Sequence, residues 1–182
     1  MQDTAKQVAG IVDNIRRVFQ VINEQSQKVK RETGLTGPQI WTIKTIRDAA
    51  PVSVKELASR IYLHPATVVG IIDRLEESGF VTRTRSREDR RVVLVELTLK
   101  GRQLVGKAPE AIQGVLVTGL EKMPAKKRNI IDNGLAELVK MLGIETMPPQ
   151  LMLSHELNLQ RHVSRNAENN EKTIKTKKAK RI

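Results

Sequence analysis

Apolar residues recur at helical spacing along most of the chain. Between residues 8 and 22 they fall at steps of three and four, which predicts one apolar stripe on an amphipathic helix. Further stripes predict five more helices, each following a residue suited to a helix start: Thr36, Ser53, Pro65, Thr98 and Pro124. Pro109 and three glycines predict a kink in the tract after Thr98. The stripe at 8–22 fits either an intramolecular core or a seam between two copies, and spacing alone does not separate the two.

The period changes from 3.6 to 2 after residue 79. Residues 80–85 and 91–97 are rich in β-branched side chains and flank the polar turn Ser86–Asp89, which predicts a hairpin. We expect Val93, Val95 and Leu97 to face inward, with Val92, Leu94 and Glu96 on the opposite side. The expected fold class is therefore mainly α, or α+β, with a two-stranded wing.

Two short helices joined by a tight turn and followed by a basic hairpin form a winged helix-turn-helix, which binds DNA. The second helix, about 65–78, is the expected recognition helix. Its exposed start must approach bases closely, and small residues stand there: Pro65, Ala66, Thr67, Val69 and Gly70. Thr67 can hydrogen-bond a base edge or a phosphate, whereas Ala66, Val69 and the Thr67 methyl suit a thymine methyl.

The hairpin carries the densest positive charge of this region. Five arginines lie within nine residues: Arg83, Arg85, Arg87, Arg90 and Arg91. Arginine suits a narrow minor groove, and we expect Asp89 to hold one guanidinium in its binding pose. A solvated surface loop is the alternative, which the preceding helix-turn-helix pattern disfavours. Four flanking residues complete the candidate DNA contacts: Thr36, Ser53, His64 and Arg74.

Composition supports a polyanionic partner. Lys and Arg number 32 against 20 Asp and Glu, so the formal net charge is +12. Aromatic residues make only 2%, which favours duplex DNA over single strands that need stacking platforms. The absence of cysteine excludes disulfides, thiol nucleophiles, thiolate metal clusters and cysteine redox sensing. No apolar run approaches the roughly 20 residues of a membrane span, and the first ten residues lack a secretion leader. We expect a cytoplasmic, nucleoid-associated protein with no membrane partner.

Three motifs suggest other chemistry and are discounted. Residues 101–107 match most of a phosphate-binding loop, but Ala108 stands where Mg²⁺ needs a hydroxyl. The three histidines are scattered without ligand company, so we expect no metal site. Trp41 is expected in the core, with the lining of a ligand cleft as the alternative. We therefore expect neither a cofactor nor an enzyme.

Residues 35–101 resemble the DNA-binding core of the MarR family of transcriptional regulators. The resemblance is carried by LTGPQIWTI, VSVKELASRI and HPATVVGIIDRLEESGFVTRTRSREDRRVVLVELTLKG, above all by Asp89-Arg90-Arg91 followed by Leu97-Thr98 and Gly101. It implies groove-facing positions for Pro65, Ala66 and Thr67, a minor-groove position for Arg91 and a supporting one for Asp89. Val69 and Gly70 depart from the family's threonine and arginine, so direct base reading is expected to be poorer here.

The resemblance also implies an obligate homodimer that binds a pseudo-palindrome and is commonly released by a small molecule. The expected dimerisation residues come from both ends of the fold: Ile11, Ile15, Val18, Ile22, Ile131, Leu135, Leu138 and Leu142. We expect a repressor; the alternative is a basic protein that coats DNA without sequence preference.

We divide the chain into an N-terminal dimerisation helix (1–34), the winged helix-turn-helix (35–98), C-terminal dimerisation helices (99–144) and a basic, disordered tail (145–182). Residues 172–182 hold six basic residues and no acidic one, and their role as solvated end or DNA-binding arm stays open.

Overall fold

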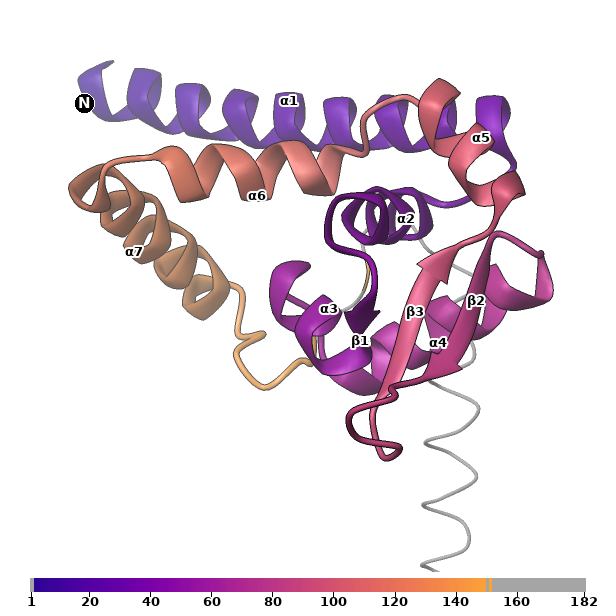
Figure 1. The fold of residues 1–182 in the computed structure, drawn as a ribbon. Coiled ribbons are helices and arrows are strands. Elements are labelled where there is room, and N and C mark those ends of the chain that lie inside the picture. Colours follow the sequence, from indigo (N-terminus) through magenta and orange to yellow (C-terminus); the bar gives the residue numbers. More distant parts are fainter. Residues whose placement is uncertain (1, 150, 152–182) are drawn as a thin grey trace, which may run out of the picture.

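The structure, a computed structural model, describes residues 2–149 and 151 and is mainly helical (Figure 1). The helices are α1 (Gln2–Thr33), α2 (Gly37–Ala49), α3 (Val54–Arg60), α4 (Pro65–Glu77), α5 (Leu99–Lys107), α6 (Ile112–Lys122) and α7 (Ala125–Met141). The strands are β1 (Val52–Ser53), β2 (Val81–Arg85) and β3 (Val93–Leu97). The predicted fold class, a winged helix-turn-helix with flanking helices, is confirmed.

Side chains start the helices where the sequence predicted. The Ser53 hydroxyl accepts the Glu56 N–H at 3.1 Å, and the Thr98 hydroxyl accepts the Gly101 N–H at 3.1 Å. At the start of α2, the Thr36 N–H donates to Gln39 Oε1 at 2.9 Å. At α3 only half of the capping box forms, because the Glu56 carboxylate accepts instead from Arg60, one turn further on, at 2.7 Å.

The first helix is longer than its apolar stripe. The sequence supports a stripe only over residues 8–22, but α1 continues to Thr33 and ends at Gly34, whose φ is +72°. Its last turns bury Ser26 and Val29, and α1 packs against α2 and α6. The apolar side chains of its first half stay exposed, which agrees with a seam and not with an intramolecular core.

The sheet has one strand more than predicted. Its order is β1-β3-β2 and all pairs are antiparallel, with Val52 opposite Val95 and Arg85 opposite Val93. Val95 and Leu97 are buried, as predicted, but Val93 is 36% exposed. The prediction for Val93 is wrong because that residue pairs with Arg85 at the end of the hairpin, beyond the helices that cover the rest of the sheet.

The predicted kink near Pro109 is a complete break. Helix α5 ends at Lys107 and α6 begins at Ile112. Ala108, directly before the proline, has extended backbone angles (φ −70°, ψ 136°), because the proline ring disfavours helical backbone in the preceding residue. The break separates the helix that follows the wing from the helix that packs against α1.

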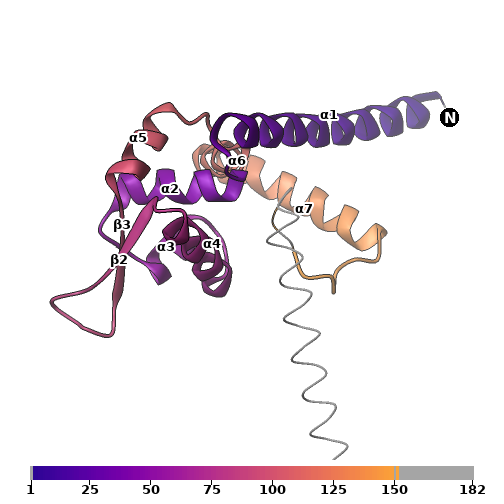
Figure 2. The ribbon, with the colours of Figure 1, turned by 90° about the vertical axis from the view of Figure 1, so that its right-hand side faces the viewer.

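The core lies between α2, α3, α4 and the sheet. Its fully buried side chains include Ile40, Ile43, Ile46, Leu57, Ile71, Ile72, Leu75 and Val95. Leu151, in the segment predicted as tail, is 9% exposed and joins this core, whereas residues 152–182, with the basic end, lie outside the described residues. Figure 2 shows the winged part at one end of the molecule and the free halves of α1 and α7 at the other.

Candidate DNA-binding interface

The start of α4 presents a small, apolar surface. His64 caps the helix, its Nδ1 accepting the Ala66 N–H at 3.3 Å, and Pro65 occupies the first turn. Pro65 and Ala66 are exposed, Val69 is 42% exposed and Gly70 is partly exposed. This face can approach bases closely, but its side chains offer methyl groups and no hydrogen bonds.

Thr67 does not belong to that face. It is only 9% exposed, and it lies on the stripe that packs Val68, Ile71 and Leu75 into the core. The expectation of a base or phosphate contact from Thr67 does not fit this placement. The helical period places Thr67 one turn before Ile71, so the inward direction was readable from the spacing.

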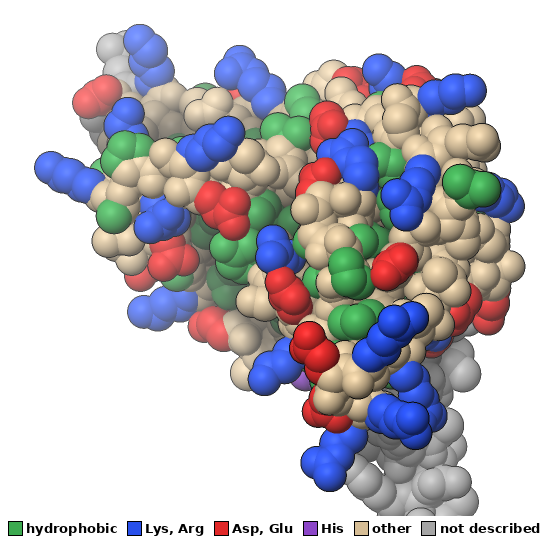
Figure 3. Space-filling view, viewed as in Figure 1, with side chains coloured by type: hydrophobic (Ala, Val, Ile, Leu, Met, Phe, Trp, Pro, Cys, Tyr) green, Lys and Arg blue, Asp and Glu red, His purple; other side chains and the backbone are tan. Residues whose placement is uncertain are grey.

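The wing carries a cluster of exposed arginines, here called the wing arginines: Arg85, Arg87, Arg90 and Arg91. Within residues 2–149 and 151, none of these four guanidiniums forms an ion pair or a side-chain hydrogen bond. Figure 3 shows basic side chains gathered at the lower end of the molecule, over the hairpin. Four unpaired positive charges at the tip of a hairpin can bind phosphates and enter a narrow minor groove.

The turn between the strands is organised by short polar side chains. Ser86 Oγ accepts the N–H groups of Glu88 at 3.2 Å and Asp89 at 3.4 Å. Asp89 Oδ1 accepts the backbone N–H of Arg91 at 2.9 Å. The expectation that Asp89 holds a guanidinium is therefore wrong in its detail: the carboxylate shapes the tip through the backbone and leaves the arginine side chains free.

Arg83 has a different task from the other hairpin arginines. Its guanidinium donates to Asp73 at 2.6 Å and to Glu76 at 2.8 Å, both on α4, and only 26% of its side chain is exposed. Glu76 also accepts the Arg83 backbone N–H at 3.2 Å. These bonds tie β2 to the recognition helix. The one signal for these bonds in the sequence is the pair of carboxylates three residues apart on one face of α4.

The remaining predicted contacts are occupied within the fold. The hydroxyls of Thr36 and Ser53 take part in helix starts, Thr36 by donating to Gln39 at 3.0 Å. Arg74 is partly buried in the last turn of α4 and is already engaged in an interaction. Their contacts with DNA stay predictions.

The chain was compared with known proteins. The model of the MarR family matches residues 35–93. The transcriptional regulator MgrA of Staphylococcus aureus is 30% identical over 124 residues, which cover 68% of this chain and 78% of MgrA. The chain belongs to the MarR family. Its wing and its helix-turn-helix are thus those of a MarR-type DNA-binding transcriptional regulator.

Two further proteins are similar to this MarR-family regulator. TtmR of Methylorubrum extorquens is 37% identical over 102 residues, which cover 54% of this chain and only half of TtmR. The solved structure of BpsR from Bordetella bronchiseptica, whose DNA binding is regulated by 6-hydroxynicotinic acid, has a TM-score of 0.50 at 25% identity. That match covers 70% of this chain and 91% of BpsR.

Helices α1 and α7 expose apolar side chains in the described part of the chain. On α1, Ile11 and Val18 are 47% and 54% exposed, and Ile15 and Ile22 are partly buried. Helix α7 has no buried residue; its Leu135 is 57% exposed, and Leu142, the residue that follows the helix, is 65% exposed. Figure 3 shows apolar side chains in the recess between α7 and α3. Exposed apolar surface of this extent marks an interaction site.

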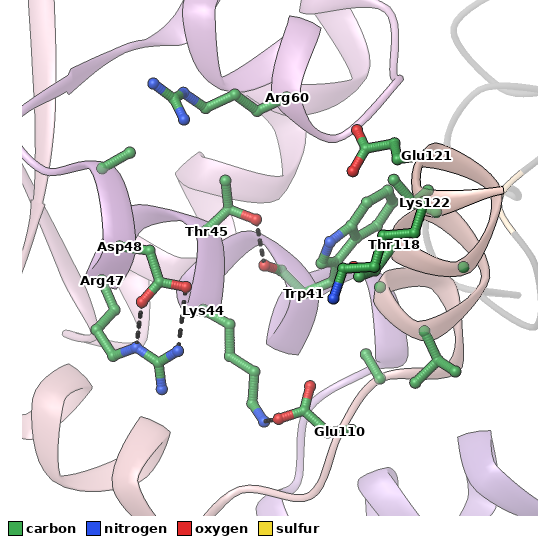
Figure 4. Close-up of a pocket in the computed structure, with 16 residues that line it drawn as sticks. Trp41, Lys44, Thr45, Arg47, Asp48, Arg60, Glu110, Thr118, Glu121 and Lys122 are labelled. Carbon is green, nitrogen blue, oxygen red and sulfur yellow. Dashed lines mark hydrogen bonds and ion pairs between the residues drawn. The ribbon is translucent and has the colours of Figure 1, made fainter. Parts of the chain in front are cut away.

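A groove of about 740 Å³ lies between α2 and α6 (Figure 4). Trp41 lines it and packs partly buried against the core, so the cleft alternative fits and the prediction of a buried core tryptophan is correct only in part. Lys44, with 10% of its side chain exposed, pairs with Glu110 across the groove at 2.5 Å. The hydrogen bond from Arg47 lowers the pKa of the Asp48 carboxyl and raises the pKa of Arg47 itself.

The segment that mimics a phosphate-binding loop is helical. Gly101 lies in the first turn of α5, where its N–H bonds to Thr98, and Val105 is buried. Among residues 2–149 and 151, no three His, Asp or Glu side chains gather as a metal site requires. No helix in that same part of the chain has the length and apolar character of a membrane span.

Proposed function

We propose that this protein is a repressor that binds a pseudo-palindromic operator as a homodimer. One observation carries the proposal: the winged helix-turn-helix presents the exposed start of α4 together with four wing arginines that have no side-chain partner within residues 2–149 and 151. In a two-fold dimer the two α4 helices enter major grooves about 10 base pairs apart, and each wing reaches a flanking minor groove. A dimer bound there over a promoter blocks access of the polymerase to the DNA.

The side chains of α4 indicate which bases are read. Pro65, Ala66 and Val69 supply apolar contacts, which suit the methyl group of thymine, and Gly70 adds no side chain. None of them can form the paired hydrogen bonds that identify guanine or adenine. Sequence preference then depends strongly on the wing, because arginine favours the narrow minor groove of A·T-rich DNA. We infer an operator with thymines facing α4 and A·T-rich flanks.

The dimer rests on the uncovered faces of α1 and α7. Helix α1 offers Ile11, Ile15, Val18 and Ile22, and α7 offers Ile131, Leu135, Leu138 and Leu142. These stripes come from opposite ends of the chain, so a second copy related by a two-fold axis can cover both at once. Each Leu or Ile side chain transferred from water into such a seam contributes about 1.5–3 kcal/mol.

Competition between specific and random DNA tests the function. The probe is the inverted repeat upstream of the protein's own coding region, and random duplex of equal length is the competitor, both at physiological salt. A regulator keeps a preference of about 10³-fold or more for its site. Equal affinity for both DNAs would contradict the proposal and support the alternative of a protein that coats DNA. Transcription in vitro from the same promoter then tests repression. The protein should lower the amount of transcript; a higher or unchanged amount would contradict a repressor.

We also propose that the groove between α2 and α6 binds a small organic acid that releases DNA. The similar protein BpsR is regulated by 6-hydroxynicotinic acid, and the groove combines the Trp41 ring with the Lys122 ammonium at its rim. Because Trp41 is the chain's one tryptophan, its fluorescence reports binding of that acid directly. Quenching and loss of operator binding in the same concentration range support the site. Unchanged fluorescence up to millimolar acid contradicts it for this class of ligand.

A further inference from the structure

The tight turn of the helix-turn-helix holds an unusual tyrosine. Tyr62 has a φ of +53°, the left-handed region that bulky side chains rarely adopt, and no other non-glycine residue in the described part of the chain does so. The turn is closed by the Leu63 N–H, which donates to the Ala58 carbonyl at 3.1 Å. This backbone conformation directs the side chain outward, where it is 65% exposed.

The hydroxyl of this side chain reaches a distant helix. Tyr62 donates to Glu121 Oε1 at 2.9 Å, across 59 positions of sequence, and Glu121 lies in the last turn of α6. In Figure 4 the Glu121 carboxylate lies at the rim of the groove, on the far side of Trp41 from Glu110. The contact therefore joins the turn directly before the recognition helix to a helix outside the winged domain.

Contacts tie the rest of the winged domain to that turn. Arg83 ties β2 to α4, and α3 packs against α4 and against β1. The domain meets α1 and α6 mainly through α2, whereas α5 packs against both α2 and β3. Packing of α6 mainly along one helix of the domain leaves rotation about that helix as its softest motion. A second contact away from that axis, such as the one between Tyr62 and Glu121, restrains the rotation.

We propose that Tyr62 and Glu121 are positioning residues that fix the angle of α4 against α6, and thereby the spacing between half-sites that the protein accepts. The inference rests on the proposed function, since only a dimer on two half-sites has a spacing to fix. Each added base pair rotates one half-site by about 34° relative to the other. A restrained angle tolerates little of this rotation, whereas a free one tolerates more.

The contact has its own spectroscopic signal. The hydrogen bond to Glu121 raises the pKa of the Tyr62 phenol, and its negative charge acts in the same direction, against a smaller opposite effect of Arg128. Tyr62 is the chain's one tyrosine, so alkaline titration of absorbance near 295 nm follows this phenol alone. The bond needs the protonated phenol. It is intact below the ordinary pKa and is lost as the pH rises through the raised one.

The test uses three variants of the full chain: Tyr62→Phe, Glu121→Ala and the double variant. Tyr62→Phe removes the hydroxyl but keeps the ring and the backbone conformation, so the variant folds. Affinity is measured on operators whose half-sites are moved closer or apart by one base pair. We expect each variant to reduce the preference for the best spacing by about two- to fivefold, the contribution of one hydrogen bond. The double variant should match the single ones, because both remove the same contact.

Two outcomes overturn the inference. If the spacing preference of both single variants equals that of the wild type, the contact does not fix the angle. If Glu121→Ala leaves the midpoint of the phenol titration unchanged, the contact is absent in solution. Failure of the proposed function differs from both, because the wild-type protein would then show no preferred spacing at all.

Discussion

Arginines of the same hairpin have different roles in this protein. Arg83 is bound to two carboxylates of α4, whereas Arg91 is exposed at the tip with its guanidinium unpaired in the described part of the chain. Removing Arg83 would leave Asp73 and Glu76 without their shared cation, and removing Arg91 would leave the fold untouched. Arg83 thus stabilises the position of the wing against α4, whereas Arg91 is available to bind DNA.

Arg91→Ala should weaken operator binding by about 1–3 kcal/mol, because a guanidinium in a narrow minor groove is lost. Fluorescence anisotropy on the operator measures the change. Arg102→Ala is the matched control, since Arg102 is an exposed arginine on α5, outside the wing. Equal affinities of the two variants would remove Arg91 from the interface.

Gly101→Ala should lower the free energy of unfolding by about 1–3 kcal/mol, the range for overpacking. A Cβ at residue 101 would stand 2.1 Å from the Phe80 carbonyl oxygen, which is backbone and cannot move aside alone. Gly106→Ala, on the same helix with nothing within 4 Å, is the control and should be neutral or stabilising. Urea unfolding at one protein concentration compares them; equal stability would contradict the close approach.

The roles of some residues could be predicted from the sequence because their hydrogen-bond partners are only a few residues away. The helix starts at Ser53 and Thr98 follow from a side chain and an amide three residues away. The partners of Arg83 lie seven and ten residues away on another element, and that of Tyr62 lies 59 away. Such contacts depend on how elements pack, which the spacing of residues along the chain does not encode.

Helix α7 is held by little within the described part of its own chain. Helix α7 buries no residue, in contrast to α4, which buries five. An amphipathic helix gains most of its stability from the surface that its apolar stripe packs against. In the proposed dimer, the order of α7 therefore depends on the partner copy that covers it.

Leu135→Glu should convert the dimer into monomers. Two leucines leave the seam in each dimer, so the loss of association free energy is about 3–6 kcal/mol. Sedimentation or light scattering measures the mass in solution. Asn133→Glu, an exposed change on the same helix, adds the same charge outside the predicted stripe and should leave the dimer intact. A dimeric Leu135→Glu protein would place the seam elsewhere.

At the scale of elements, long periodic patterns were predicted well and short ones were not. The apolar stripes of α2, α4 and α7 predicted correctly that these segments are helices and approximately where each helix begins and ends. Strand β1 has two residues, too few for any period, and exists because Val52 and Ser53 pair with β3. The break before α6 was predicted only as a kink, because a proline determines that the helix is disturbed but not how far its parts separate.

Part of the excess charge of the molecule lies on the wing, where a duplex can bind it. The formal charge is +12, and the four wing arginines occur twice in a dimer. Neutralised phosphates release counterions, so binding should weaken with salt in proportion to the number of contacts.

If both wings bind fully, the slope of log K against log salt should be about −7, and Arg87→Ala should make it less steep by about 2 per dimer. Affinity measured from low to physiological salt gives the slope. A slope near zero would contradict binding through the wing.

Removal of residues 172–182 tests whether the basic end is a solvated end or a DNA-binding arm. If the slope of the shortened chain is unchanged, these residues do not contact DNA; if the slope is flatter, they form an accessory arm.

The exposed stripe of α1 has a consequence for synthesis. Helix α1 leaves the ribosome before α7, and about 110 further residues must be translated after Thr33 before α7 is complete. At about 5–20 residues per second this takes roughly 5 to 22 s. During that interval the apolar stripe of each nascent α1 has no completed α7 to pack against. Neighbouring ribosomes on one messenger RNA bring such stripes close together. The stripe of α1 is therefore prone to premature association during synthesis, and chaperones have reason to cover it.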